Sequence, residues 1–318
     1  MKFQRLVFAD FDQATLPEEI WERARGSAEE IVLVDASSPG YRSVVAGADG
    51  LILRLGLSAD AELLGTATKL RYIGVLATDF GRIDTEAAKR HGVVVSNIAD
   101  YSTRSVAEFA LGMALDMFRD LSAERFRGEE GDFGETQFVG RELSALNVGV
   151  VGAGNLGRRF AEIMSGGIGA NVSYWSRTRR PELEAASGVT YLPLSELVAQ
   201  SDLLSVHVAL NADTEGLLNA QLVRSLPHRA GLISTVPNEI FDLQEVLARC
   251  MAGELRFATD HGGDLSSEEL VQARQTSDVL LYAPIGYATS EATQRKFEVL
   301  VANIEAFLNG APTNHVNP

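Results

Sequence analysis

The chain has 318 residues, of which 46% are hydrophobic and 22% charged, and its formal net charge is −15. This length is sufficient for two domains with separate cores, and the composition is that of an ordinary globular protein. The negative charge argues against a binder of nucleic acid or of acidic membranes. No apolar run has the length of a membrane span or the form of a signal peptide, and Cys250 is the single cysteine, so we expect a cytoplasmic location.

The first hundred residues alternate between β-branched runs and helical patterns. We expect strands at 6–8, 31–34, 51–53, 72–76 and 93–95, with helices that begin at Pro17 and cover 84–90. One long helix is predicted over 101–125, in which Ser105 and Glu108 have the spacing of a capping box. An acidic loop is expected over 128–136.

A second alternating series follows this loop. Its predicted strands lie at 147–151, 172–175, 203–208, 231–234, 257–259 and 279–282, and a last helix covers 290–309. Such alternation predicts parallel sheets covered by helices. The expected fold is therefore α/β, with two doubly wound parallel-sheet domains, Rossmann-like or flavodoxin-like, and a ligand cleft between them.

The glycine-rich turn at 152–157 is the strongest motif in the chain. It follows a β-branched run and opens a helix, which we expect to stop at Gly166 and Gly167. Gly152 allows the tight turn, Gly154 the approach of a pyrophosphate, and Gly157 close packing of helix and strand, with Asn155 and Leu156 between them. The alternative is a plain turn in a buried sheet, but strand and helix flanks favour a dinucleotide site.

The end of the next predicted strand indicates which nicotinamide cofactor binds. An NAD site usually has a carboxylate there for the ribose 2′-hydroxyl, whereas this chain has none before Glu182. We assign Ser176, Arg177 and Thr178 to a 2′-phosphate, supported by Arg180, because arginine binds phosphate through charge-assisted hydrogen bonds. The sequence thus predicts NADP(H) over NAD(H), the alternative being a solvated basic turn.

Four stretches together carry a resemblance to a known family. They are GVLATDFGRIDTEAAKRHGVVVSNI at 74–98, YSTRSVAEFAL at 101–111, VGVVGAGNLG at 148–157 and SDLLSVHVALNADTEGLLN at 201–219. The chain resembles the D-isomer-specific 2-hydroxyacid dehydrogenases, which implies an NAD(P)-dependent oxidoreductase with a small-molecule substrate, assembled as a homodimer. It also implies a discontinuous substrate domain, 1–101 plus 290–318, and a dinucleotide-binding domain, 102–289.

The resemblance also implies cofactor contacts beyond the glycine turn. Residues near the adenosine half would be His207, Val208 and Thr214, and residues near the nicotinamide would be Val106, Thr235, Val236 and Asp260.

Three positions depart from the family's catalytic pattern. Pro237 stands where the family has an arginine, Leu265 where it has a glutamate and Pro284 where it has a histidine. Arginine clamps a keto-acid carboxylate, and histidine, tuned by the glutamate, protonates the carbonyl oxygen. Proline has neither a titratable group nor a side-chain donor, so the usual reaction is expected to be lost.

Candidate replacements lie on the same loops. His261 is the candidate proton donor, Asp264 would orient it or accept a substrate amine, and Tyr287 would donate a phenolic proton. The alternatives are a solvated loop for His261 and packing or a subunit contact for Tyr287. No metal site is indicated, because the five histidines are scattered and Cys250 has no partner motif.

Three functions remain open from the sequence. The first is an NADP(H)-dependent oxidoreductase acting on an imine, an activated alkene or a bulkier carbonyl. The second is a non-catalytic NADP(H)-binding sensor or interaction protein. The third is a conventional 2-hydroxyacid dehydrogenase, which turnover of glyoxylate or hydroxypyruvate would reveal.

Overall fold

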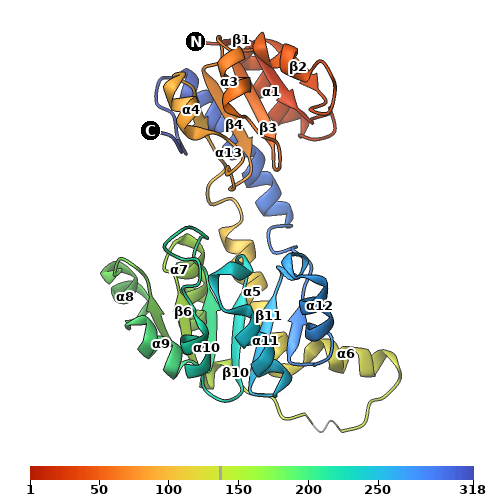
Figure 1. Cartoon of the computed structure of the whole chain (residues 1–318), viewed down its shortest axis with the longest axis vertical. Coiled ribbons are helices and arrows are strands. Elements are labelled where there is room, and N and C mark those ends of the chain that lie inside the picture. The colour runs from red at the N-terminus through yellow and green to blue at the C-terminus, as the bar shows by residue number, and fades with distance from the viewer. Residues whose placement is uncertain (136–137) are drawn as a thin grey trace. The chain divides into compact units, whose positions relative to one another are not determined.

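The computed structural model describes residues 1–135 and 138–318, which divide into two compact units. The first unit comprises Met1–Tyr101 and Thr289–Pro318, and the second comprises Ser102–Ala288. Each unit contains a parallel β-sheet with helices packed against it (Figure 1). The predicted α/β fold class with two parallel-sheet domains is confirmed.

The sheet of the first unit has five strands in the order β2-β1-β3-β4-β5, all parallel. This is the flavodoxin-like order. Successive residues of β1 point to opposite faces, so that Val7 joins one buried cluster and Leu6 and Phe8 join another. The strands are β1 (Phe3–Ala9), β2 (Ala28–Val34), β3 (Gly50–Arg54), β4 (Tyr72–Leu76) and β5 (Val94–Ser96), and the helices between them are α1 (Glu18–Gly26), α2 (Tyr41–Ala46), α3 (Ala61–Thr66) and α4 (Thr85–Arg90).

The last helix, α13 (Ser290–Leu308), returns to the first unit and covers one face of its sheet (Figure 1). Phe307 stacks on Phe3 with ring centroids 5.7 Å apart and lies 4.8 Å from the ring of Tyr72. Arg23 of α1 forms ion pairs with Glu298 and Glu305 of α13. The core of this unit is therefore built from both ends of the chain.

The sheet of the second unit has seven parallel strands in the order β12-β11-β10-β9-β6-β7-β8. Its first six strands in chain order are arranged 3-2-1-4-5-6, the Rossmann order, and the switch point lies between β6 and β9. The strands are β6 (Asn147–Val151), β7 (Asn171–Trp175), β8 (Thr190–Tyr191), β9 (Leu203–Val206), β10 (Ala230–Ser234), β11 (Leu255–Thr259) and β12 (Val279–Leu281). Other helices here, which the sequence reading did not place, are α8 (Pro181–Ser187), α9 (Leu194–Gln200), α10 (Ala220–Ser225), α11 (Leu243–Met251) and α12 (Ser267–Ala273).

The predicted long helix over 101–125 is wrong, because two helices cover this region. They are α5 (Thr103–Arg119) and α6 (Leu121–Glu129), separated by Asp120 at φ 53°. The carboxylate of Asp116 accepts hydrogen bonds from the Ser122 backbone at 2.7 Å and from its hydroxyl, which holds the break. The capping box is also wrong, since Ser105 lies inside α5 and its hydroxyl donates to the Ser102 carbonyl. Residue 136 of the predicted loop lies outside the described residues.

The helix after the glycine turn also ends differently from the prediction. Helix α7 (Asn155–Glu162) continues into a π-helical turn, η2 (Ile163–Ile168), and the chain leaves the helix at Gly169, where φ is 80°. Gly166 and Gly167 lie inside this π-helical turn. The left-handed backbone conformation that ends the helix occurs at Gly169 instead. Strand β9 ends at Val206, two residues before the predicted end, so that the next residues belong to a loop.

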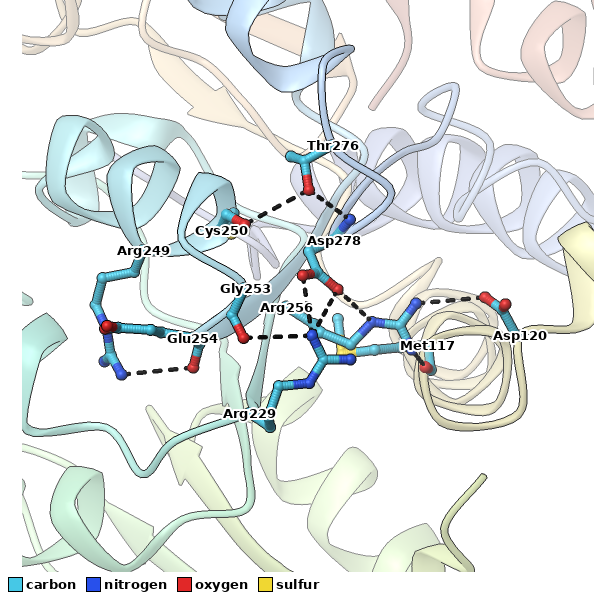
Figure 2. A network of polar contacts seen from close by, with 10 residues as sticks. All are labelled: Met117, Asp120, Arg229, Arg249, Cys250, Gly253, Glu254, Arg256, Thr276 and Asp278. Carbon is cyan, nitrogen blue, oxygen red and sulfur yellow. Dashed lines mark hydrogen bonds and ion pairs between the residues drawn. The ribbon is translucent and has the colours of Figure 1, made fainter. Parts of the chain in front are cut away.

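A buried ionic network ties α5 to the far strands of the second unit (Figure 2). Arg256 of β11 donates to the carbonyl of Met117 and lies 3.4 Å from carboxylate oxygens of Asp120 and Asp278. Arg229 reaches Asp278 from the loop before β10, at 3.0 Å. Arg256 and Asp278 are only 7% and 8% exposed, so both charges need the compensation that their ion-pair partners in this network provide.

We expect Asp278→Ala to lower the free energy of unfolding by about 3–5 kcal/mol, because it removes one of the two carboxylates beside the buried Arg256 guanidinium and also the partner of Arg229. Urea unfolding followed by circular dichroism measures this loss. The control is Glu129→Ala, which breaks the exposed Arg125–Glu129 pair of α6 and should cost at most about 0.5 kcal/mol. Equal effects of the two substitutions would contradict the assignment.

Candidate functional site

The glycine turn between β6 and α7 is shaped by three different steric demands. Gly152 has φ 97°, and a Cβ there would lie 2.8 Å from the carbonyl oxygen of His207. A Cβ at Gly157 would overlap the carbonyl oxygen of Gly152, so α7 can approach the strand only with glycine at this position. A Cβ at Gly154 meets nothing within 4 Å and points into open space. Open space beside a helix start is what a pyrophosphate requires.

A pocket of about 470 Å³ lies beside this turn, within the second unit. Its walls come from three segments, namely the glycine turn, the end of β7 and the loop after β9. Among its lining residues are the predicted Gly152, Gly154, Ser176, Arg177, Thr178, Arg180, His207, Val208 and Thr214. It is also lined by Ala153, Trp175, Ala209, Asn211, Asp213 and Leu217, which the sequence reading did not assign.

The predicted Asn155 and Leu156 do not line this pocket. They are the first two residues of α7, Asn155 exposed and Leu156 half-buried. Val106 is half-buried in the first turn of α5.

The arginines after β7 have separate partners. Arg179 forms a bidentate hydrogen-bonded pair with Glu184 at 2.7 and 2.8 Å and lies over the ring of Tyr191, which directs it away from the pocket. Arg177 and Arg180 line the pocket, and Arg177 forms an ion pair with Asp213 at 2.9 Å. Two of the three basic side chains in this segment are thus positioned for an anion.

His207 forms part of the pocket wall and is buried. Burial lowers its pKa to about 3, so the imidazole is neutral at physiological pH. Its Nε2 lies 2.9 Å from the hydroxyl of Ser205, and its ring packs on Phe160 with centroids 5.2 Å apart. Its Nδ1 has no hydrogen-bond partner in the described ranges. A neutral ring that packs on α7 shapes the pocket rather than binding a phosphate.

Unpaired polar atoms gather where β10 and β11 end. Within the described residues, the hydroxyl of Thr235, Oδ1 of Asn238 and Oδ1 of Asp260 are buried without a hydrogen-bond partner, and the side chain of Val236 packs in the core beside them. Burial raises the pKa of Asp260. An unpaired buried polar atom is costly, so donors and acceptors left open at one strand edge fit a polar ligand group such as an amide. Asn238 was missed from the sequence, although it directly follows Pro237 at the strand end.

The loop after β11 brings His261 and Asp264 together. Nδ1 of His261 lies 2.7 Å from Oδ2 of Asp264, across the short 3₁₀ turn η4 (Gly262–Asp264). The backbone of His261 is held by the hydroxyl of Thr259 and by the Asn238 amide, which donates to the His261 carbonyl at 3.1 Å. A carboxylate on Nδ1 fixes the orientation of the ring.

Tyr287 lies apart from this pair. Its side chain is half-exposed, and in the described part of the chain no hydrogen bond links its phenol to His261 or Asp264. The preceding Gly286 is buried against Phe109 of α5, which fixes the backbone here. Pro284 is exposed, and Pro237 and Leu265 are half-buried.

Comparison with known proteins identifies the family. The family model for the NAD binding domain of the D-isomer specific 2-hydroxyacid dehydrogenases matches residues 111–280. Glyoxylate reductase of Thermococcus litoralis is 30% identical over 281 residues, which is 85% of this chain and 83% of the relative. Hydroxypyruvate reductase of Blautia hydrogenotrophica is 27% identical over 80% of this chain and 81% of the relative.

The chain belongs to the D-isomer specific 2-hydroxyacid dehydrogenase family. It is therefore an NAD(P)-dependent oxidoreductase with a nicotinamide cofactor. Its fold matches an acyclic imino acid reductase solved with NADPH and D-Arg, with a TM-score of 0.85, 22% identity and coverage of 98% and 100% of the two chains. It also matches a D-2-hydroxyisocaproate dehydrogenase with a TM-score of 0.83, 20% identity and coverage of 99% and 100%.

Among the described residues, no group of three or more histidine, cysteine, aspartate or glutamate side chains is placed to hold a metal ion. Over residues 1–135 and 138–318, no helix combines the length and apolar character that crossing a bilayer requires.

We expect Gly154→Val to abolish NADPH binding, because its side chain would occupy the open space at the helix start that the pyrophosphate requires. The fold should stay intact, because a Cβ at this position meets no protein atom within 4 Å. Quenching of protein fluorescence by NADPH measures binding, and circular dichroism measures the fold. Gly166→Val is the matched control, since that glycine also faces open space but lies outside the pocket. Normal binding by Gly154→Val would place the cofactor elsewhere.

Proposed function

We propose that this family member is an NADP(H)-preferring reductase that acts on a substrate other than a simple 2-keto acid, with His261 as its proton donor. The observation that carries the proposal is the His261–Asp264 pair, 2.7 Å apart at the carboxyl end of β11. When bound, the cofactor supplies a hydride. The chain's own residues must then bind both ligands, orient them and deliver a proton.

The cofactor preference is supported by the wall of the pocket after β7. Ser176, Arg177 and Thr178 line it at the position where a carboxylate would select NAD. Arg180 adds a second cation, while Glu184 is already paired with Arg179. A 2′-phosphate placed here would gain charge-assisted hydrogen bonds that NAD(H) cannot make.

We expect NADP(H) to bind at least tenfold more tightly than NAD(H), a difference of about 1.4 kcal/mol. Arg177→Asp should reverse this order, because it puts a carboxylate where the phosphate would lie. Isothermal titration calorimetry with both cofactors measures the ratio. Arg179→Asp is the matched control, since Arg179 is engaged by Glu184 outside the pocket. Equal affinities of the wild-type protein for the two cofactors would contradict the preference.

The proton donor follows from the geometry of the dyad. With Nδ1 held by Asp264, the proton that His261 would deliver is the one on Nε2, on a side chain that is 29% exposed. After that proton leaves, the neutral ring still donates from Nδ1 to Asp264. The Asn238 amide fixes the same loop through the His261 carbonyl, so the donor is held from two sides.

The substrate class follows from what the strand ends lack. Pro237, three residues after the end of β10, offers no cation to clamp a carboxylate, and Pro284 offers no acid. A C=N, an activated C=C or a bulkier C=O bond needs a proton donor but not that clamp. The imino acid reductase of similar fold makes imines the first class to assay.

We further propose a homodimer and a cytoplasmic location. Large apolar side chains are exposed on and after α6, namely Leu121, Phe126, Phe133 and Val139. Such exposure is typical of a protein interface, and sedimentation analysis tests it. The lone Cys250 is unpaired and buried, and burial raises its pKa to about 12, which suits a protein without disulfides.

We expect kcat/KM below about 10⁴ M⁻¹s⁻¹ for glyoxylate, pyruvate and hydroxypyruvate with NADPH, because the clamp and the usual acid are absent. On a substrate that the enzyme does reduce, His261→Ala should lower kcat by about 10²–10⁴-fold with little change in NADPH affinity. Steady-state kinetics measure both.

His228→Ala is the control. His228 is exposed and precedes β10, so it lies at the amino ends of the strands, whereas His261 follows the carboxyl end of β11. Rapid turnover of these keto acids would restore the conventional activity named for the glyoxylate and hydroxypyruvate reductases. An active enzyme indifferent to His261→Ala would remove His261 from the mechanism.

A further inference from the structure

The cofactor pocket contains a carboxylate that the sequence reading did not assign. Asp213 lines the pocket from the loop after β9, and Arg177 lines it from the end of β7. Their side chains meet at 2.9 Å, so an ion pair joins two walls of the pocket. Arg177 has no other ion pair within the described residues.

The position of Asp213 is set by its own loop. Its backbone N–H donates to Oδ1 of Asn211 at 2.9 Å, and the Asn211 N–H donates to the Thr214 hydroxyl at 2.9 Å. That hydroxyl donates in turn to the Ala209 carbonyl at 2.7 Å. Side-chain-to-backbone bonds of this kind fix a turn without a helix or strand, so the carboxylate is presented to the pocket by an ordered loop.

The negative charge of Asp213 affects how well the pocket can accept a 2′-phosphate. A 2′-phosphate beside Arg177 would face the carboxylate of Asp213, and two anions close together repel each other. Asp213 already accepts a hydrogen bond from Nη1 of Arg177, so the phosphate and the carboxylate would have to share one guanidinium. NAD(H) carries no charge at this position and leaves the ion pair intact.

We propose that Asp213 is a specificity-determining residue, which competes with the cofactor 2′-phosphate for Arg177 and thereby limits the preference for NADP(H) over NAD(H). The proposal rests on the proposed function, since it assigns the phosphate to Arg177. Because the side chains of Arg177 and Asp213 are 79% and 75% exposed, water and salt screen the pair and the effect is modest.

The test compares Asp213→Asn with wild-type protein by isothermal titration calorimetry, using NADPH and NADH separately. We expect Asp213→Asn to bind NADPH about two- to fivefold more tightly, as the loss of an exposed competing ion pair allows, while NADH affinity changes less than twofold. The gain should shrink at high salt. It should also shrink when Arg177 is replaced by alanine, because competition for the guanidinium is then absent.

Glu215→Gln is the matched control. It removes the same charge two residues away, on an exposed side chain that does not line the pocket. It should leave both affinities unchanged, and an equal gain from Glu215→Gln would reduce the effect to net charge and overturn the proposal.

Two other results would overturn it. Unchanged NADPH affinity in Asp213→Asn would show that the carboxylate does not compete. Weaker NADH binding with unchanged NADPH binding would make Asp213 a ribose ligand instead. These outcomes differ from failure of the proposed function, in which the wild-type protein itself binds NADH as tightly as NADPH.

Discussion

The structure of the second unit depends on the contact between Gly157 and the carbonyl oxygen of Gly152. No side chain larger than hydrogen fits there, and this lets α7 begin directly against the turn that ends β6. The same approach brings the ring of His207 against Phe160 of α7. The helix start, the turn and the loop after β9 therefore meet around one pocket, at the switch point where α/β sheets bind ligands.

Ion pairs determine which arginine side chains face that pocket. In a chain of net charge −15, Glu184 takes Arg179 away from the pocket and Asp213 holds Arg177 within it. Arg256, by contrast, is buried in the network with Asp278 and serves the packing of α5 (Figure 2). The solvent exposure of the ion pairs distinguishes arginines that are available to a ligand from one that stabilises the packing. An exposed ion pair exchanges partners at small cost, and a buried one does not.

The other end of the proposed site is made by loops rather than by helices. Asn238 contacts the carbonyl of His261, and Asp264 contacts its ring, so two successive strand ends support one imidazole. Buried oxygens of Thr235, Asn238 and Asp260 that have no hydrogen-bond partner within the described residues lie at the same strand ends. A ligand that paired these atoms would recover the desolvation cost of leaving them open.

Sequence pattern alone located every described strand except the short β8, predicted two parallel sheets, and placed the glycine turn between β6 and α7. These features are local, since periodicity and steric demand act within a few residues. Tertiary structure decided the rest. The break at Asp120 depends on Asp116 reaching Ser122, and the pairing of Arg177 with Asp213 joins residues 36 positions apart. The hydrogen bond from Asn238 to the His261 carbonyl exists only because β10 and β11 lie side by side in the sheet. Such contacts join side chains distant along the chain, and no periodicity encodes which two will meet.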